Sequence, residues 1–514
     1  MPTPVKVDSN IVGLSYAEEA TLGVASGSEI WYPLDPNEYD DFGAEIETVA
    51  RNPINASRQR RKGVVTDLNA SGGFQQDLTQ TNLTRLMQGF FFADAHERVG
   101  NAPLNGAAGS TDVLVDFVAT GSKINVTTGT KYKVGDLLKS TGFVNAANNH
   151  PVMRVTAIST NELTVDVTLV DETWTVGTIE KVGHQYGTGD VGIVLAANVL
   201  TITSTVGFAD QSYQVGEWIF IGGDLTAEKF TLGASGENAP GYARITAVAA
   251  NTLTLKEPTF TALTDAGTGD TIRIYSGIFL RNEKTSSLIK RRSYQIERTL
   301  GDDGSGVQSE VLVGSVPNEF SLTLESANKA MCGLSFVGTD DETRSGATGV
   351  KAGNRDAVLT TEDAYNTSSD VYQQRLFVHG VTPTPTSLFA YVTDATITLN
   401  NNATGLKAIA TLGSFEVSLG DFEVSGELEV YFATVAAVDA VRNNSDVGFN
   451  TILAANNAGL VYDIPLLSLG GGRVTVEKDE PIMLPLEKQA AECDNGYTMA
   501  ATYFNYLPTI AMPA

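Results

Sequence analysis

An internal repeat is the feature that most restricts the fold of this chain. YKVGDLL at residues 132–138 and PVMRVTAISTNELTV at 151–165 return as YQVGEWI at 213–219 and GYARITAVAANTLTL at 241–255. The matched positions pair Tyr132 with Tyr213, Gly135 with Gly216, Arg154 with Arg244, Asn161 with Asn251, and Leu163 with Leu253. Two copies are too few for a solenoid. The repeat therefore predicts a tandem pair of small domains.

Each copy has the pattern of a small antiparallel barrel. The V-G-D/E segment predicts a turn that leads into a strand. In the R-V/I-T-A-V/I run that follows, side chains alternate between the inside and the outside. The Asn is typical of the hairpin turn before the L-T-V/L strand. The two domains are interpreted as spacers without a ligand, or as modules with a carbohydrate-binding or other docking role. Trp218, Tyr213 and Tyr242 could stack on a sugar, although the match of Tyr213 with Tyr132 favours a place in the core.

Composition restricts the class of protein. A hydrophobic fraction of 42% in 514 residues can fill a core, and 50 glycines with recurring Thr, Val and Ile favour short strands. The net charge of −26 repels nucleic acid and anionic lipid, but suits a surface past which DNA must slide. No run of 18 apolar residues exists, and MPTPVKVDSN lacks the apolar stretch of a signal peptide. We expect a protein that is made and kept in a cytoplasm.

Sequence motifs give no sign of catalysis. The chain has no G-x-S-x-G, H-E-x-x-H or Walker A pattern, and its four histidines have no ligand-type spacing. GDDGSG at 301–306 lacks the later Glu of a calcium loop and is interpreted as a turn. We predict that the protein is not an enzyme and holds no cofactor or metal.

The segments outside the repeat combine strands with one helix. GAEIETVAR at 43–51 predicts a strand, and GVVTDLNASGGFQQDL at 63–78 predicts a strand, a turn and a second strand. In DLTQTNLTRLMQGFFF, the apolar residues follow the i, i+3, i+4, i+7 spacing of an amphipathic helix, with Thr79 or Thr81 as its N-cap. The residues with this spacing are Leu83, Leu86, Met87 and Phe90.

A strongly acidic strand is predicted near the C-terminus. In DFEVSGELEVYF, the apolar side chains at 422, 424, 428, 430 and 432 should share one face, and Glu423, Glu427 and Glu429 should lie on the other. Paired catalytic carboxylates would need an isolated pair in an apolar cleft, whereas this strict alternation indicates a row that faces water.

The stretch NASRQRRKG at 55–63 gathers Arg58, Arg60, Arg61 and Lys62 in an otherwise acidic chain. A solvated loop tip is one interpretation. A nuclear localisation signal is another, but nothing else here is typical of a eukaryotic protein. Nucleic-acid binding would need interleaved aromatic residues and basic surroundings. Docking onto an acidic surface of an identical copy is favoured, because acidic copies repel one another without positive patches at their contacts.

The order of these segments resembles the tail tube proteins, or major tail proteins, of long-tailed double-stranded DNA phages. The resemblance rests on the basic loop, the strand pair with GGF, the helix NLTRLMQGFFF, the stretch NNNATGLKAIATLGSFEVSLGDFEVSGELEVYF at 400–432, and the closing strand GYTMAATYFNYL at 496–507. It covers roughly residues 10–105 and 276–514. The V-G-D repeats look like the extra domains that some of these proteins carry.

The resemblance implies a mainly β fold, in which a tail-tube β-sandwich with a flanking α-helix is interrupted by two small tandem β-barrel-like insert domains. The expected division is 1–105 and 276–514 for the two halves of the tail-tube domain, with inserts at 106–188 and 189–275. The inserts should project outward and be replaceable by a short linker. A sheath would be obstructed by them, which favours a non-contractile, siphovirus-type tail.

The implied function is that of a structural virion protein, assembled in the host bacterial cytoplasm. Homohexameric rings would stack into a hollow tube that conducts the genome during ejection, and the partners would be tail terminator, tape measure and tail-tip proteins. Arg58, Arg60, Arg61 and Lys62 would make contacts between rings. Glu423, Glu427 and Glu429 would line the lumen and repel the phosphates of passing DNA.

Other functions remain as alternatives. A host-surface or glycan-binding protein built from β-domains would use the repeats for recognition. A fimbria-like bacterial surface protein would share the tandem β-domains, but the missing signal peptide opposes it.

Overall fold

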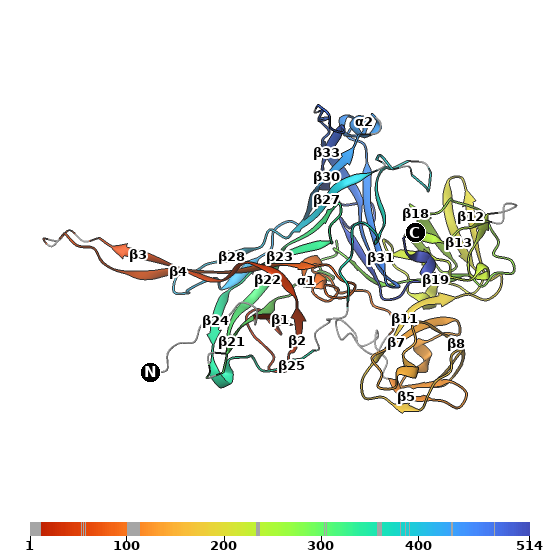
Figure 1. Cartoon of the computed structure of the whole chain (residues 1–514), viewed down its shortest axis with the longest axis horizontal. Coiled ribbons are helices and arrows are strands. Elements are labelled where there is room, and N and C mark those ends of the chain that lie inside the picture. The colour runs from red at the N-terminus through yellow and green to blue at the C-terminus, as the bar shows by residue number, and fades with distance from the viewer. Residues whose placement is uncertain are drawn as a thin grey trace. The chain divides into compact units, whose positions relative to one another are not determined.

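The fold is built almost entirely from β-strands (Figure 1). The computed structural model describes residues 12–513, apart from positions 53, 55, 57, 100–113, 233–236, 303, 305, 357–361, 381, 386, 390, 433, 434 and 477. The α-helices in this described part are short, namely α1 (Met87–Phe91) and α2 (Ala436–Arg442). The mainly β fold class predicted from the sequence is confirmed.

The chain divides into two compact units, which we describe separately. Unit 1 consists of Met1–Phe92, Ile289–Ala364 and Asp394–Leu428, and unit 2 consists of Ala93–Leu288, Tyr365–Thr393 and Glu429–Ala514. The predicted boundary between residues 105 and 106 lies outside the described residues. The four-part domain division made from the sequence therefore stays a prediction.

Unit 1 is organised around the long strand β22 (Val307–Glu325), which joins two layers of strands. The first half of β22 pairs with β21 and β24, and its second half pairs with β23 and β27. The other strands of the unit are β1 (Gly13–Glu18), β2 (Ile30–Leu34), β3 (Pro36–Arg51), β4 (Arg61–Asp77), β21 (Tyr294–Asp302), β23 (Met331–Val337), β24 (Asp340–Arg344), β25 (Asn354–Arg355), β28 (Thr404–Leu406) and β29 (Glu416–Ser418). Two further strands, β27 (Val392–Asn400) and β30 (Glu423–Tyr431), continue past the limits of the unit.

Aromatic rings fill the space between the two layers. The ring of Phe90 in α1 lies 6.0 Å from that of Phe320 and 5.4 Å from that of Phe336, measured between centroids. Tyr294 of β21 contacts Phe336 at 6.5 Å. The two contacts with Phe336 are edge-to-face, and such contacts add to the stability that burial of the rings provides. Helix α1 is thus part of the core of unit 1.

Helix α1 is shorter than the sequence predicts. Its apolar face is confirmed, because the side chains predicted to form it are at most 1% exposed: Leu83, Leu86, Met87 and Phe90. The predicted N-caps are wrong, since the hydroxyl groups of Thr79 and Thr81 both donate to the carboxylate of Glu362. That carboxylate also accepts the backbone N–H of Thr81. These bonds compete with helical ones, so residues 82–86 form turns and the helix begins only at Met87.

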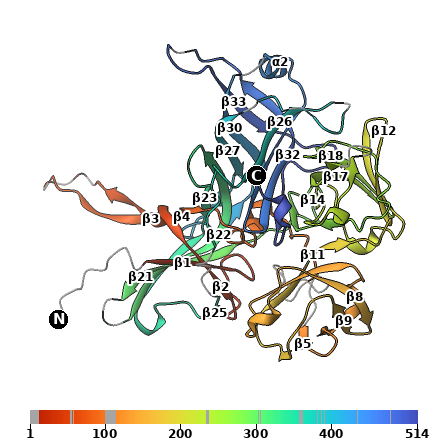
Figure 2. The same ribbon diagram turned by 45° about the vertical axis from the view of Figure 1, so that its right-hand side comes forward.

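Strands β3 and β4 form a hairpin that extends beyond the rest of its sheet (Figure 1 and Figure 2). Their pairing runs from Pro36 and Gln76 to Arg51 and Arg61, whereas β4 pairs with β23 only through residues 71–77. Residues 44–51 and 61–70 therefore form a two-stranded arm, and we use this name below for these strands and the described residues of the connection between them. The rise of a strand gives its paired part a length of about 25 Å.

The turn predicted within GVVTDLNASGGFQQDL is wrong, because β4 is one continuous strand there. The glycines serve close packing instead. A Cβ atom on Gly72 would lie 2.3 Å from a methyl carbon of Leu312, and one on Gly73 would lie 3.1 Å from the carbonyl oxygen of Leu334. A glycine within a strand commonly marks such a close approach.

In unit 2, the two sequence repeats form two small β structures with separate cores. The first contains β5 (Leu114–Val118), β6 (Lys123–Val126), β7 (Asp136–Thr141), β8 (Met153–Ser159), β9 (Glu162–Val165), β10 (Glu172–Thr173) and β11 (Thr178–Gln185). The second contains β12 (Val191–Ala196), β13 (Val199–Ser204), β14 (Trp218–Ile221), β15 (Thr231–Leu232), β16 (Glu237–Asn238), β17 (Gly241–Ala249), β18 (Thr252–Lys256) and β19 (Arg273–Tyr275). Strand β11 pairs with both β7 and β19 and so connects the two.

The repeated hairpin has the same construction in both copies. Asn161 and Asn251 lie in the turns, as predicted. The register shifts between residues 155 and 157 in the first copy and between 245 and 247 in the second, which places a bulge at Thr156 and at Thr246. Each of these threonines donates its hydroxyl to a backbone carbonyl of the partner strand, at 3.1 and 3.3 Å. The sequence repeat therefore extends to the register of the strands.

The remaining part of unit 2 is a sheet centred on β32 (Ala458–Gly471). This strand pairs with β31 (Val447–Ala455), β33 (Met483–Ala490) and β34 (Ala500–Phe504). Strand β26 (Val371–Val378) pairs with β31, and β20 (Ile278–Arg281) pairs with β34. Trp218, Phe220 and Tyr242 of the second repeat share one buried cluster with Val461 and Phe504 of this sheet. The repeats and the sheet of unit 2 therefore have a common core.

Candidate assembly surfaces

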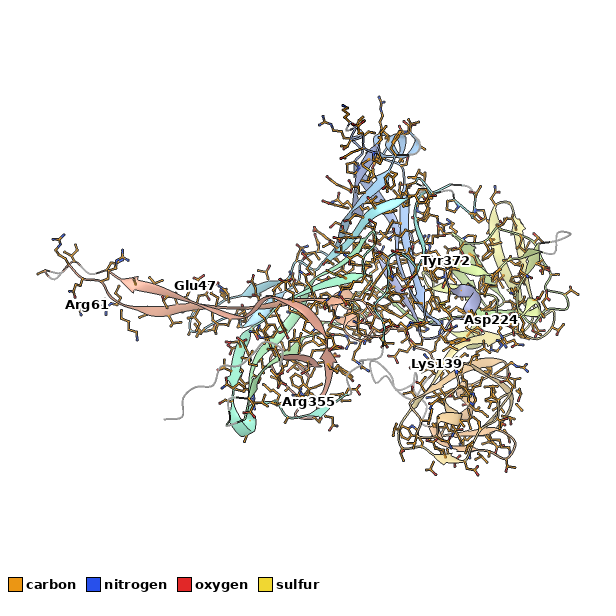
Figure 3. All side chains as sticks on the ribbon, viewed as in Figure 1. Glu47, Arg61, Lys139, Asp224, Arg355 and Tyr372 are labelled. Atoms are coloured by element: carbon orange, nitrogen blue, oxygen red, sulfur yellow. The ribbon has the colours of Figure 1, made fainter. Side chains whose placement is uncertain are left out.

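The four cations singled out in the sequence lie together at the tip of the arm. Arg58 and Arg60 belong to the connection between β3 and β4, and Arg61 and Lys62 begin β4. Figure 3 labels Glu47 along the arm and Arg61 near its tip. All four side chains are exposed, and none of them forms an ion pair with another residue that the structure describes. The tip therefore presents uncompensated positive charge.

The register of the arm brings a fifth cation to the tip. Arg51 lies directly opposite Arg61 in the pairing of β3 with β4. Like charges at directly opposite positions destabilise a strand pair. Such an arrangement becomes favourable only when an anionic group from elsewhere approaches the tip.

A second basic cluster in unit 1 behaves differently. Arg291 pairs with Glu416 at 3.0 Å, and Arg292 pairs with Glu18. These cations are neutralised within the folded chain, whereas those at the tip of the arm are not. Arg291 and Arg292 therefore serve the fold of unit 1, whereas the cations of the arm tip are available to bind a partner.

The arm also exposes apolar side chains along its length. Ile46, Val49, Val64 and Val65 are between 52% and 58% exposed, and Ile54 near the tip is fully exposed. An isolated two-stranded hairpin is marginally stable in water at best. Exposed apolar residues on such a hairpin are typical of a surface that another protein covers.

Strand β30 has the alternation that the sequence predicts. Val424, Leu428 and Val430 are at most 2% exposed. Glu423, Glu427 and Glu429 are all exposed. Glu429 accepts a hydrogen bond from the hydroxyl of Thr393 at 3.4 Å. The structure therefore places the three predicted carboxylates on one face of one strand.

In unit 1, the polar face continues across neighbouring strands. Glu319, Ser321, Thr323 and Glu325 of β22 lie directly opposite Asn400, Thr398, Thr396 and Asp394 of β27. Next to them, a shallow hollow of about 280 Å³ is lined by the polar residues Asp40, Gln75, Glu319, Ser321, Thr323 and Ser335, among others. Glu325 and Asp394 meet although like charges at opposite positions are unfavourable. This face combines carboxylates with small polar side chains and carries no Lys or Arg at the positions named here.

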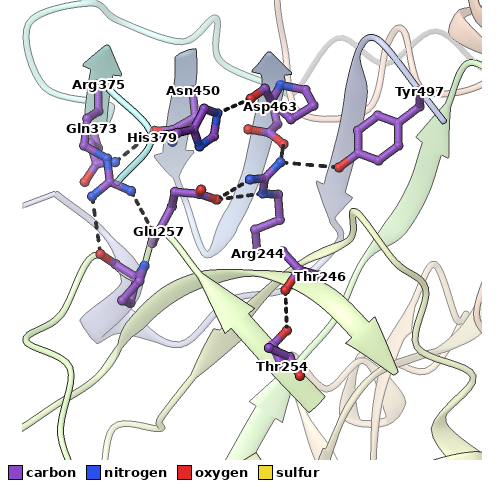
Figure 4. Close-up of polar contacts among 12 residues, drawn as sticks. Arg244, Thr246, Thr254, Glu257, Gln373, Arg375, His379, Asn450, Asp463 and Tyr497 are labelled. Carbon is purple, nitrogen blue, oxygen red and sulfur yellow. Dashed lines mark hydrogen bonds and ion pairs between the residues drawn. The ribbon is translucent and has the colours of Figure 1, made fainter. Parts of the chain in front are cut away.

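A buried ionic network, which sequence reasoning missed, attaches the second repeat to the sheet of unit 2 (Figure 4). The guanidinium group of Arg244 lies 2.6 Å from Glu257 and 3.3 Å from Asp463 of β32. Arg375 of β26 donates to the carbonyl oxygens of Glu257 and Pro258. The matching residue in the first repeat, Arg154, instead forms a half-exposed pair with Asp166 at 3.5 Å. No pattern in the sequence indicates this difference between the two repeats.

Burial shifts the pKa of two members of this network, Asp463 and Arg375. Loss of hydration raises the pKa of Asp463 to about 6, although the adjacent Arg244 acts in the opposite direction. Burial also disfavours the charged form of Arg375 and therefore lowers its pKa to about 10. Ionised groups in an apolar interior are stable only when they are paired. Removing one member of the network would therefore leave its partner as an unpaired buried charge and destabilise the fold.

The aromatic residues considered for sugar stacking are part of the protein core. Trp218, Tyr213 and Tyr242 are 1%, 5% and 0% exposed. They cannot present a ring face to a glycan, and the interpretation of Tyr213 as a core residue is correct.

Metal-type clusters and membrane-spanning helices are absent from the described residues. Three or more His, Cys, Asp or Glu side chains do not gather there in a way that could hold a metal ion. Within the same part of the chain, no helix has both the length and the apolar character that crossing a membrane requires.

Comparison with known proteins identifies the family of the chain. No curated protein matches the chain. The family described as phage tail tube protein matches residues 9–490, which is nearly the whole chain. The chain therefore belongs to the phage tail tube protein family, whose members are structural proteins of the virion tail.

Proposed function

We propose that six copies of this chain close into a ring, and that rings stack into a hollow tail tube through which double-stranded DNA leaves the virion. The observation that carries the proposal is the arm. It is a long hairpin with exposed apolar residues and an unpaired cationic tip, in a chain that belongs to the tail tube family. A free arm of this kind gains stability by lying on a second copy.

The arm provides the contact from one ring to the next. Its tip carries Arg58, Arg60, Arg61 and Lys62, and each neighbouring copy has a net charge of −26. Opposite charge steers such surfaces together and fixes their register. In this arrangement the positive tip meets an acidic surface of the adjacent ring.

The polar face of β22, β27 and β30 lines the lumen. Glu423, Glu427 and Glu429 belong to it, together with the acidic and small polar residues of β22 and β27. A basic channel would bind DNA by releasing its counterions. An acidic lumen repels the phosphates and lets the genome slide without being held.

Membership of the tail tube family implies assembly of the chain with itself and with other tail proteins. We infer that it proceeds in the bacterial cytoplasm with tail terminator, tape measure and tail-tip proteins at the two ends of the tube. The repeats project from its outer surface, which favours a non-contractile tail without a sheath.

Electron microscopy of the purified protein tests the proposal. We expect uniform hollow rings or tubes with sixfold symmetry in negative stain. A protein that stays monomeric at every concentration and salt level would contradict ring formation. Tubes with another rotational symmetry would overturn the hexamer while leaving a tube intact.

A further inference from the structure

The strands of unit 1 follow a definite pairing pattern, which we call the first motif. The paired strands β3 and β4 are followed by α1 and then, beyond the two repeats, by β21, β22, β23 and β24. The long strand β22 pairs with β21 and β24 through its first half and with β23 through its second half. Strand β23 also pairs with β4, and β1 pairs with β21.

The same order and the same pairings return later in the chain, as the second motif. The paired strands β27 and β30 are followed by α2 and then by β31, β32, β33 and β34. The long strand β32 pairs with β31, β34 and β33. Strand β33 also pairs with β30, and β26 pairs with β31. Every pairing named for the first motif therefore has a counterpart in the second.

The two long strands also share a short sequence. Strand β22 reads VPNEFSL at 316–322, and β32 reads IPLLSL at 464–469. The extra residue of β22 coincides with a register shift directly after Pro317. Proline is rare inside strands, yet Pro317 and Pro465 both lie where the long strand passes to the partner of its second half. The sequence therefore supports a duplication that the pairings indicate.

The motifs differ in the partners of two strands. The second half of β22 pairs with β23 and, through residues 319–325, with β27 as well. Its counterpart, residues 468–471 of β32, pairs with β33 alone among the strands that the structure describes. Likewise, β27 pairs with both β30 and β22, whereas the described pairing of β3 is with β4 only. The chain thus has one free edge on β32 and another on β3.

The backbone of β32 offers hydrogen-bonding groups at its free edge. The N–H of Gly472 donates to Pro485, and the N–H of Ala491 donates to Leu466, so the even-numbered residues here bond to β33. In an antiparallel pair, the residues between such bonded pairs direct their N–H and C=O groups to the opposite side. Leu469 therefore directs its backbone groups to the free edge. An edge of this kind is a template for a further strand.

We propose that this chain carries the tail tube motif twice, and that the free edge of β32 in one copy of the chain pairs with β3 of a second copy, as β22 pairs with β27 within the chain. The inference rests on the proposed function and deepens it by naming the contact that closes the ring. Two different surfaces meet in this contact, as a ring requires. Because each copy brings two motifs, three copies supply six motifs to a ring, and six copies supply twelve.

The first motif indicates which residues should meet. Ser321 of β22 lies opposite Gly333 of β23. Gly333 lies opposite Gln75 of β4, and Gln75 lies opposite Glu38 of β3. These four residues form one row across the sheet. Ser468 is the counterpart of Ser321 in the shared sequence. Repetition of the row around a ring brings Ser468 of one copy close to Glu38 of the next, and both side chains are exposed.

A cross-linking experiment tests this neighbourhood. In a Cys493→Ser background, Cys332 remains as a buried thiol. Ser468→Cys and Glu38→Cys proteins are mixed, assembled and treated with a flexible bismaleimide, whose reach covers adjacent register positions. We expect a mixed dimer from the mixture and none from either protein alone. Thr343→Cys replaces Glu38→Cys in the control, because Thr343 is exposed on β24, which pairs only with β22 among the described strands.

The outcomes of the cross-linking are decisive. A mixed dimer of Ser468→Cys with Glu38→Cys, and none with Thr343→Cys, would support the proposal. Intact tubes that give no mixed dimer would overturn it, and so would dimers of equal yield with the β24 control. Failure of the wild-type chain to form tubes would instead contradict the proposed function.

A second experiment removes one backbone donor from the free edge of the full-length chain. Leu469→Pro lacks the N–H that faces this edge, and Leu469→Ala is the matched control that loses the side chain but keeps the N–H. We expect the concentration needed for tube formation to be about tenfold higher for the Pro variant than for the Ala variant. The melting temperatures of their monomers should agree within a few degrees. Equal assembly of the two variants would overturn the proposal. A Pro variant that melts far below the Ala variant would also overturn it, because the N–H would then be bonded within one copy.

Discussion

At the scale of single residues, the four cations of the arm tip lead to a prediction about stacking. Exposed ion pairs contribute only about 0.2–1 kcal/mol each, so single changes of Arg58, Arg60, Arg61 or Lys62 to Ser should be nearly silent. Changing all four should shorten the tubes, because every copy in a ring loses the contact. The melting temperature of the monomer should not change, since these side chains are exposed and have no partner among the described residues. Tube length by microscopy and melting by calorimetry measure the two effects. Full-length tubes at every salt concentration would show that the tip is only a solvated turn.

Asp463 leads to a second prediction, about pH. Its pKa is raised to about 6 in the folded chain, above the ordinary value of 3.8. Between these values the folded state binds the proton more tightly than the unfolded chain, so the contribution of Asp463 to the free energy of unfolding falls as pH rises from about 4 to 6. Asp463→Asn cannot ionise. The melting temperature of the wild type minus that of the variant should therefore decrease over this range and level off above it. Calorimetry at several pH values checks this, and a constant difference would contradict it.

At the scale of elements, the local sequence pattern predicted the structure correctly where the element has one buried and one exposed face. The alternation of β30 and the hairpins of the repeat follow from the two-residue period of a strand, which fixes the face of every side chain. Contacts between residues far apart in the sequence determined the features that were predicted wrongly. The capping of α1 failed because Glu362, far away in the sequence, captures Thr79 and Thr81. Gly72 and Gly73 of β4 indicated a turn, but their role depends on the close approach of Leu312 and Leu334, which belong to other strands. No pattern within β4 contains that information.

The acidic face of β30 gives a prediction at the same scale. Changing Glu423, Glu427 and Glu429 to Lys should leave assembly intact, because exposed substitutions alter the free energy of unfolding by no more than about 0.5 kcal/mol each. The altered lumen should retain DNA through counterion release. Sedimentation of tubes with short DNA at low and high salt measures this retention, with the corresponding triple Gln variant as the control for charge removal. Equal retention by the wild-type, Gln and Lys tubes would contradict a lumen position.

At the scale of the whole molecule, the ion pairs reveal how an acidic chain manages its charge. Several cations inside the units are matched with carboxylates, such as Arg244 with Glu257 and Arg298 with Glu310. The tip of the arm keeps its positive charge unmatched. Because the copies otherwise repel one another at a net charge of −26, assembly should be favoured by moderate salt and opposed by high salt. The tip and the bulk surface thus respond to screening in opposite directions.

The packing of the repeats changes one expectation made from the sequence. Replacing residues 106–275 by a Gly/Ser linker was expected to leave assembly intact, but it would uncover Ile452, Val461, Phe504 and Leu507 and leave Asp463 without Arg244. Uncovering such a cluster and a buried charge should remove several kcal/mol, a large part of the stability of an ordinary domain. We expect a variant that aggregates or melts far below the wild type. A second linker variant that also carries Val461→Thr, Phe504→Ser and Asp463→Asn should regain solubility. This result would show that the first variant fails because the apolar cluster and Asp463 are uncovered, and not because residues 106–275 are missing. Circular dichroism melting and pelleting measure both. A simple linker variant that melts within a few degrees of the wild type would show that the repeats are independent of the sheet beneath them.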